Sequence, residues 1–246
     1  TGNVFRTGKA NTGLAFVSLD ASGNREFSFF RNPSADLFLC EEQITPAMFA
    51  DCAALHFCSV DLVDWPVKAA HRRAIGLAQE AGALISFDPN VRLPLWERPE
   101  DCQAAIRAFL PFADLVKLSD DEVEFVTGCK EEREAARRLF AGGCRMLLVT
   151  RGADGAAIYT RGAYAETETI PVPVTDTTGA GDSFIGSFLY QLTRDGVTAE
   201  QLDRLSEERL ASYLQFSARY ASLTVQRKGA VMATLEELRR AYPDKE

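Results

Sequence analysis

Short apolar strands alternate with helical segments from about residue 54 onward, and this alternation constrains the fold more than any other feature. The segments read as strands are 54–58, 83–87, 114–118 and 145–150, and those read as helices are 67–80, 99–110, 119–127 and 131–141. Strands that alternate with helices form parallel βαβ units, in which helices cover both faces of the sheet. We therefore predict an α/β fold with α/β/α layers around a mostly parallel central sheet.

Two hairpins interrupt this pattern. Residues 13–19 and 25–30 read as strands joined by the turn cluster 20–24, and 156–159 and 164–169 form a second pair. The chain then reads as helical over 180–194, 199–225 with a break, and 235–241. We expect one domain over 1–246 with a small antiparallel β lid within about 12–36.

Charge and composition restrict the classes of partner. The chain has 35 acidic and 27 basic residues, a net charge of −8, and its basic residues are scattered, which argues against nucleic-acid or membrane partners. No apolar run reaches the ~18–20 residues of a membrane span, and residues 1–13 contain no signal-peptide core. The six cysteines are spread singly without a C-x-x-C pair, which indicates reduced thiols and a cytoplasmic location.

The segment DTTGAGD, residues 176–182, carries the strongest chemical signal. Gly179, Ala180 and Gly181 let a ligand approach the backbone, and the apolar helix that follows presents unpaired N–H groups at its positive end. Asp182 stands beside these amides, where a carboxylate can accept a proton from a hydroxyl. The competing interpretation is a plain tight turn with Asp182 as a helix-start residue.

DTTGAGD resembles the signature of the ribokinase-like, or PfkB, carbohydrate kinases. The resemblance implies the ribokinase-like fold, with Asp182 as the general base and the Gly179, Ala180, Gly181 and Asp182 amides stabilising the transferring phosphoryl group. It also implies ATP and Mg²⁺ as cofactors, with K⁺ in some relatives, where carbonyls near Asp176 and the Gly229 loop bind the cation. The chain has neither a G-x-x-x-x-G-K-[ST] loop nor the protein-kinase motifs.

Further segments are similar to the family's nucleotide-binding motifs. KLSDDE, residues 117–122, stands in place of N-x-x-E, with Ser119 where Asn is usual. The resemblance implies that Lys117 and Ser119 contact the nucleotide and that Glu122 binds Mg²⁺. Ser119 and Glu122 also match the pattern of a helix capping box. VTRGADG, residues 149–155, resembles V-T-x-G-x-x-G and implies nucleotide contacts from Thr150, Gly152 and Gly155, although the glycines also suit a simple hairpin turn.

Three more positions are assigned by the same resemblance. FSARYASLTV, residues 216–225, is similar to the helix that flanks the adenine, and it implies a contact from Ser217. FDPNVR, residues 87–92, resembles the F-D-x-N-x-R strand end of fructokinases and 2-keto-3-deoxygluconate kinases. It implies that Asn90 contacts the sugar and Arg92 a phosphate, since guanidinium suits bidentate oxygen binding. The alternative for Arg92 is a surface salt bridge.

The first hairpin carries the sugar-side resemblance. FFRNPSAD, residues 29–36, resembles a stretch of the same two kinase groups in which Arg31 and nearby aromatics such as Phe29 reach the sugar, with Asp182 at the reacting hydroxyl. The alternative is a hairpin edge on which Arg31 lies over aromatic rings. Family members open with a strand that carries a substrate-binding Asp and then G-G-x-x-x-N. Neither appears here, so we expect the intact molecule to be longer.

The implied activity is ATP-dependent phosphorylation of a sugar hydroxyl, with fructose to fructose 6-phosphate as the leading case. The alternatives are 2-keto-3-deoxygluconate, aminoimidazole riboside and nucleoside kinases, and, from another class, a non-catalytic ligand-binding relative or inactive fragment. The expected partners are the sugar and ATP. Exposed lid edges also favour a homodimer.

Overall fold

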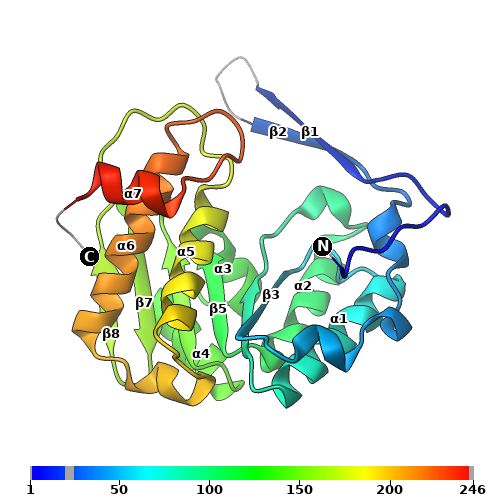
Figure 1. The fold of residues 1–246 in the computed structure, drawn as a ribbon, viewed down its shortest axis with the longest axis horizontal. Helices are drawn as coiled ribbons and strands as arrows, with labels where there is room; N and C mark the ends of the chain where they lie inside the picture. Colours follow the sequence, from blue (N-terminus) through cyan, green and yellow to red (C-terminus); the bar gives the residue numbers. More distant parts are fainter. Residues whose placement is uncertain (1, 20–24, 244–246) are drawn as a thin grey trace. The chain divides into compact units, whose positions relative to one another are not determined.

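The computed structural model describes residues 2–19 and 25–243 and divides the chain into two compact units, Thr1–Phe109 and Leu110–Glu246. The first unit begins with the predicted hairpin, whose strands are β1 (Leu14–Leu19) and β2 (Arg25–Phe30) (Figure 1). They pair antiparallel with Leu14 opposite Phe30. The predicted turn cluster 20–24 lies outside the described residues.

The hairpin turns aromatic side chains toward solvent. Phe16 and Phe30 meet edge to face with ring centroids 5.5 Å apart, and they are 56% and 64% exposed. Leu14 and Val17 are also exposed. The two-stranded sheet therefore presents apolar surface that the described part of the chain leaves accessible.

The rest of the first unit follows the predicted strand–helix alternation. It contains β3 (Ala54–Cys58), α1 (Pro66–Glu80), β4 (Leu84–Asp88) and α2 (Pro99–Phe109), and β3 pairs parallel with β4. Phe57 and Phe87 stack at 4.4 Å in the core, and Phe109 is fully buried nearby. Three short 3₁₀ helices between residues 35 and 49 were not predicted, because a single turn leaves no periodic signal.

The second unit combines a mixed sheet with helices. Its elements are β5 (Leu115–Ser119), α3 (Asp120–Thr127), α4 (Glu132–Ala141), β6 (Met146–Thr150), β7 (Ala156–Thr160), β8 (Tyr164–Thr167), α5 (Ala180–Arg194), α6 (Glu207–Thr224) and α7 (Leu235–Ala241). β5 and β6 are parallel, and β7 and β8 form the second predicted hairpin.

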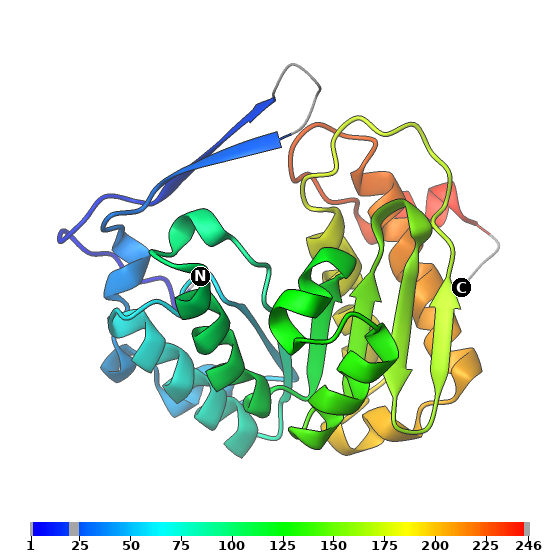
Figure 2. The ribbon, with the colours of Figure 1, turned by 180° about the vertical axis from the view of Figure 1, so that it is seen from behind.

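Helices cover both faces of this sheet. In the view of Figure 1, α5 and α6 lie in front of the strands. In the opposite view of Figure 2, α3 and α4 lie in front of them. Together with the parallel pairs and the small antiparallel sheet, this layering confirms the predicted fold class.

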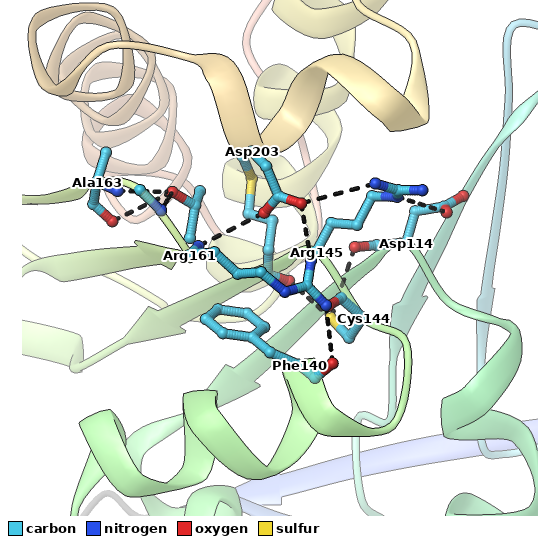
Figure 3. A network of polar contacts seen from close by, with 10 residues as sticks. Asp114, Phe140, Cys144, Arg145, Arg161, Ala163 and Asp203 are labelled. Carbon is cyan, nitrogen blue, oxygen red and sulfur yellow. Dashed lines mark hydrogen bonds and ion pairs between the residues drawn. The ribbon is translucent and has the colours of Figure 1, made fainter.

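A polar network joins the loops at the end of this sheet where β5 and β6 begin (Figure 3). Arg161, between β7 and β8, donates to the carbonyl oxygens of Phe140 (2.8 Å) and Cys144 (3.1 Å) and pairs with Asp203 at 2.7 Å. Arg145 lies 3.6 Å from the same Asp203 carboxylate. Burial raises the pKa of the Cys144 thiol to about 12. The network holds the sheet at the end away from the carboxyl ends of its parallel strands.

All six cysteines are free thiols. Across residues 2–19 and 25–243, no helix combines the length and apolar character needed to cross a bilayer.

Candidate active site

The start of α5 forms an anion-binding geometry. Gly179 is the residue before the helix and has left-handed backbone angles, φ 80° and ψ 3°. The N–H of Ala180 donates to the Thr177 carbonyl at 3.2 Å, and the N–H of Ser183 donates to the Gly179 carbonyl at 2.8 Å. The N–H groups of Gly181 and Asp182 lie in the first turn, where a helix supplies no acceptors. They and the exposed Asp182 carboxylate stand at the positive end of the helix.

Asp176 holds the loop that leads into this helix. Its Oδ1 accepts hydrogen bonds from the Thr178 N–H (2.9 Å) and hydroxyl (2.7 Å), and its Oδ2 accepts from the Gly229 N–H (2.9 Å). The carboxylate therefore joins the loop before α5 to the loop after α6. These bonds fix the direction in which the following amides point.

Gly179 is required by both conformation and space. Its φ lies in the region that side chains rarely adopt. A Cβ built on it would also stand 3.2 Å from Cα and Cβ of Ala230, in the loop after α6. The tight approach of the two loops thus depends on this glycine.

Lys117 brings a positive charge to the same place. It lies in β5 and is only 6% exposed. Its Nζ is 3.2 Å from the point where a Cβ on Gly181 would stand. The ammonium group is therefore next to Gly181 in the first turn of α5, where it adds to the positive end of the helix. The resemblance assigned Lys117 to the nucleotide, and that assignment stays a prediction.

Ser119 and Thr150 lie opposite each other at the carboxyl ends of β5 and β6. Glu122 Oε2 accepts from the Ser119 N–H at 2.9 Å in a capping box at the start of α3, so that interpretation of the sequence is confirmed. In the described residues, no three His, Cys, Asp or Glu side chains gather as a metal site. Mg²⁺ usually takes one or two carboxylates together with waters and substrate phosphates. A single carboxylate such as Glu122 fits that mode.

Gly152 and Gly155 differ in what they do. Gly155 has φ 91°, and a Cβ there would stand 2.0 Å from the Thr167 carbonyl oxygen, so the strand pairing requires glycine. Gly152 has φ 54° and nothing within 4 Å of a built Cβ. Gly155 thus serves the turn into β7, whereas the backbone at Gly152 is open to a ligand.

Ser217 lies between helices. It is fully buried, and its hydroxyl accepts from Gln191 Nε2 at 3.5 Å, while the same nitrogen donates to the Tyr213 carbonyl at 3.0 Å. The structure places this side chain in the α5–α6 interface, not on an open surface.

The sugar-side residues named from the sequence lie in the first unit. Phe29 and Arg31 line a pocket of about 850 Å³ there. The Arg31 guanidinium donates to Asp36 Oδ2 (3.0 Å from Nε) and to the Val60 carbonyl (2.8 Å), and it pairs with Asp61. Burial opposes the charge, but these carboxylates raise the pKa of Arg31 above its usual value.

The sequence interpretation missed Asp61. It follows β3 by three residues, and ligand-binding residues of open α/β sheets lie beyond the carboxyl ends of strands, which was the available signal.

Asn90 and Arg92 follow β4. Asn90 adopts φ 46°, and its N–H donates to Asp88 Oδ1 at 3.1 Å. Arg92 Nη1 donates to the Val91 carbonyl at 3.0 Å. Asn is among the residues that adopt a positive φ most readily, and its N–H bond to Asp88 holds Asn90 in this turn after β4.

Comparison with known proteins identifies the family. The model of the pfkB family carbohydrate kinases matches residues 2–237. The chain is 41% identical over 225 residues to probable fructokinase-2 of Arabidopsis thaliana and, equally, to fructokinase-2 of Solanum lycopersicum, covering 91% of this chain and 67% of each relative.

Solved structures agree with the sequence matches. The ATP-bound fructokinase of Xylella fastidiosa superimposes with a TM-score of 0.88 at 35% identity, covering 97% of this chain and 76% of that one. The fructokinase of Vibrio cholerae O395 with fructose, ADP and calcium gives 0.79 at 30% identity, covering 94% and 73%. The match extends over nearly all of the chain, including the loop before α5, and the chain therefore belongs to the pfkB family of carbohydrate kinases.

Proposed function

We propose that the protein transfers the γ-phosphoryl group of ATP to a sugar hydroxyl, converting fructose to fructose 6-phosphate. The observation that carries the proposal is the DTTGAGD loop at the start of α5, with Lys117 beside Gly181 and Asp182 exposed next to the first-turn amides. The fructokinase relatives, one solved with ATP and another with fructose and ADP, support ATP and fructose as the two substrates.

Each group at this helix start has a task in the transfer. Asp182 accepts the proton as the sugar oxygen forms its bond to phosphorus and the bond to the ADP oxygen breaks. The N–H groups of Gly181 and Asp182 and the Lys117 ammonium group neutralise the charge that develops on the phosphoryl oxygens. These donors are held in place before the reaction, so little reorganisation is needed when charge appears.

Residues around the start of α5 would also bind metal ions. Glu122 would hold Mg²⁺ as a single carboxylate, and the ion would neutralise charge on the phosphates. The Asp176 carboxylate already accepts three hydrogen bonds. A K⁺ ion near it would therefore take backbone carbonyls of this loop and of the Gly229 loop.

The proposal assigns the nucleotide to the second unit, through Ser119, Thr150 and Gly152 together with the α5 loop. Arg92 and the sugar contacts of Phe29 and Asn90 come from the first unit. Arg31 forms ion pairs with Asp36 and Asp61. It would therefore hold these two carboxylates as acceptors for sugar hydroxyls, and it would also donate hydrogen bonds to the sugar itself.

The hairpin β1–β2 would close over the sugar as a lid and exclude water. Its exposed apolar face, with Leu14, Phe16 and Phe30, would pair with a second copy of the chain in a homodimer. The six free thiols suit a cytoplasmic location.

The proposal is tested by measuring ADP release from the purified protein with fructose, 2-keto-3-deoxygluconate, ribose and aminoimidazole riboside. We expect the highest kcat/KM with fructose. A clearly higher value with another sugar would replace fructose by that substrate. Bound ATP without turnover of any sugar would contradict the enzymatic assignment and favour a ligand-binding role.

A further inference from the structure

The loop between α6 and α7, residues 225–234, packs against the turn that opens α5 (Figure 1). The N–H of Gly229 donates to Asp176 Oδ2 at 2.9 Å. A Cβ built on Gly179 would stand 3.2 Å from Cα and Cβ of Ala230, so the two backbones approach closely. A displacement of this loop is therefore transmitted directly to the segment that carries the first-turn amides of α5.

Apolar packing does little to hold the middle of this loop, because Val231 and Met232 are 53% and 45% exposed. An ion pair bridges its ends. Arg227 Nη2 donates to Glu237 Oε1 at 2.8 Å, and Nη1 lies 3.4 Å from Glu237 Oε2. The same Nη1 is 3.4 Å from the Met232 carbonyl oxygen. Arg227 therefore connects the end of α6 to α7 and to the loop itself.

The carboxylate in this ion pair is held in place by its own helix. Glu237 Oε2 accepts from the Thr234 N–H at 2.8 Å and from the Thr234 hydroxyl at 3.1 Å, in the capping box of α7. These bonds and the one from Arg227 lower the pKa of Glu237 to about 2, so the carboxylate is charged at neutral pH. The pair is partly exposed and screened by solvent, so we expect it to govern the geometry of the loop more than overall stability.

We propose that the Arg227–Glu237 ion pair is a positioning device for phosphoryl transfer, which holds residues 225–234 against Gly179 and Asp176 and so keeps the first-turn amides of α5 aligned. Both side chains act through the loop and not by contact with substrate. The inference rests on the proposed function, because the direction of these amides matters to turnover only if they stabilise a phosphoryl group. Small displacements of such donors cost a large part of their effect on the transition state.

Adjacent glutamates on α7 provide the test. Glu237→Gln removes the charge that pairs with Arg227 but keeps a side chain that completes a capping box with Thr234. Glu236→Gln makes the same change in net charge on the same helix, and it breaks only an exposed pair with Arg240 at 2.9 Å. For both variants and the unmodified protein, amide hydrogen exchange is measured by NMR without substrate, and kcat and the KM for ATP are measured with fructose.

We expect faster exchange in Glu237→Gln at the amides of Gly229 and Thr178, which both donate to Asp176, because the loop opens more often. Its kcat should fall about tenfold while the KM for ATP stays nearly the same, since the amides act mainly in the transition state. Glu236→Gln should change neither quantity. Arg227→Gln should resemble Glu237→Gln, and Arg227→Lys, which keeps the positive charge, should recover part of the lost kcat.

Equal exchange rates in Glu237→Gln and Glu236→Gln would overturn the proposal whatever the substrate is. Faster exchange with unchanged kcat in an active enzyme would also overturn it, because the loop would then move without consequence for catalysis. No turnover by the unmodified protein would instead contradict the proposed function and with it the catalytic part of this inference. The exchange rates would still decide whether the ion pair holds the loop.

Discussion

Two glycines and a lysine shape the proposed phosphate site at the level of single residues. Gly179 permits the left-handed turn and the close approach of Ala230, and Gly181 leaves room for Lys117 Nζ. The sequence predicted the loop from its glycines and the charge of Asp182. It gave no sign that Lys117 lies against Gly181, because that contact joins a strand to a helix more than sixty residues later in the chain.

Substituting Gly181 by alanine tests this contact. The new Cβ would lie 3.2 Å from Lys117 Nζ, a flexible group that can move, so we expect little loss of stability but a fall in kcat of about tenfold or more as the ammonium shifts. The matched control is Gly186→Ala, further along α5 with nothing within 4 Å, which should keep kcat and gain about 0.5–1 kcal/mol in unfolding free energy. Unchanged kcat in Gly181→Ala would remove Lys117 from the proposed site.

Asp195, at the end of α5, predicts a dependence of stability on pH. The hydrogen bond from Arg194 and a second one from the Tyr213 hydroxyl at 2.5 Å lower the pKa of Asp195 to about 2, below the usual 3.8. Because the unfolded chain binds the proton more tightly, this group stabilises the fold above about pH 4, and the contribution is lost as pH falls toward 2.

We therefore expect Asp195→Asn to lower the unfolding free energy by about 1 kcal/mol at pH 7, a value reduced for solvent screening, and by much less at pH 2.5. Urea unfolding of both proteins at the two pH values measures this. A deficit of the same size at both would show that the loss does not come from the charge of Asp195.

At the scale of secondary-structure elements, the connection from β6 to β7 depends on Gly155. Its positive φ and the 2.0 Å distance from a built Cβ to the Thr167 carbonyl oxygen leave no space for a side chain. We expect Gly155→Ala to destabilise the protein by about 2–4 kcal/mol, since the backbone of β8 must move.

Gly152→Ala is the control, because φ is also positive there but nothing lies within 4 Å of an added Cβ, and it should cost only about 1 kcal/mol. Thermal unfolding of the two variants gives the comparison. Equal shifts in Tm would show that the positive φ alone, and not the contact with β8, makes Gly155 necessary.

The sequence predicted the regular elements well because their patterns are local. Strand–helix alternation located β3, and the helical pattern after Gly179 located α5, both at the bounds that the structure gives; the capping box at Ser119 marked the start of α3. Side-chain environments depend on distant packing and were not predicted. Nothing in the sequence indicated that the Ser217 side chain is buried against Gln191, and the contact of Ser217 with the adenine stays a prediction. The position of Asp61 after β3 was visible in the sequence, but its pairing with Arg31 was not.

On the scale of the whole molecule, the proposed tasks divide between the two compact units. The DTTGAGD loop, Lys117 and the nucleotide-side strand ends lie in Leu110–Glu246, and the proposed sugar contacts Phe29 and Asn90 lie in Thr1–Phe109. Family membership rests on matches that span both units. Sugar preference and phosphoryl-transfer chemistry should therefore respond to substitutions in different parts of the chain.

The most direct test of the central claim is the kcat of Asp182→Asn in the ADP-release assay with fructose, together with ATP affinity by calorimetry. Asp182 is exposed in the first turn of α5, and asparagine keeps its shape without the basic carboxylate. We predict a fall in kcat of about 10²–10⁴ with ATP affinity and Tm close to those of the unmodified protein. A kcat near that of the unmodified protein would show that Asp182 is not the base.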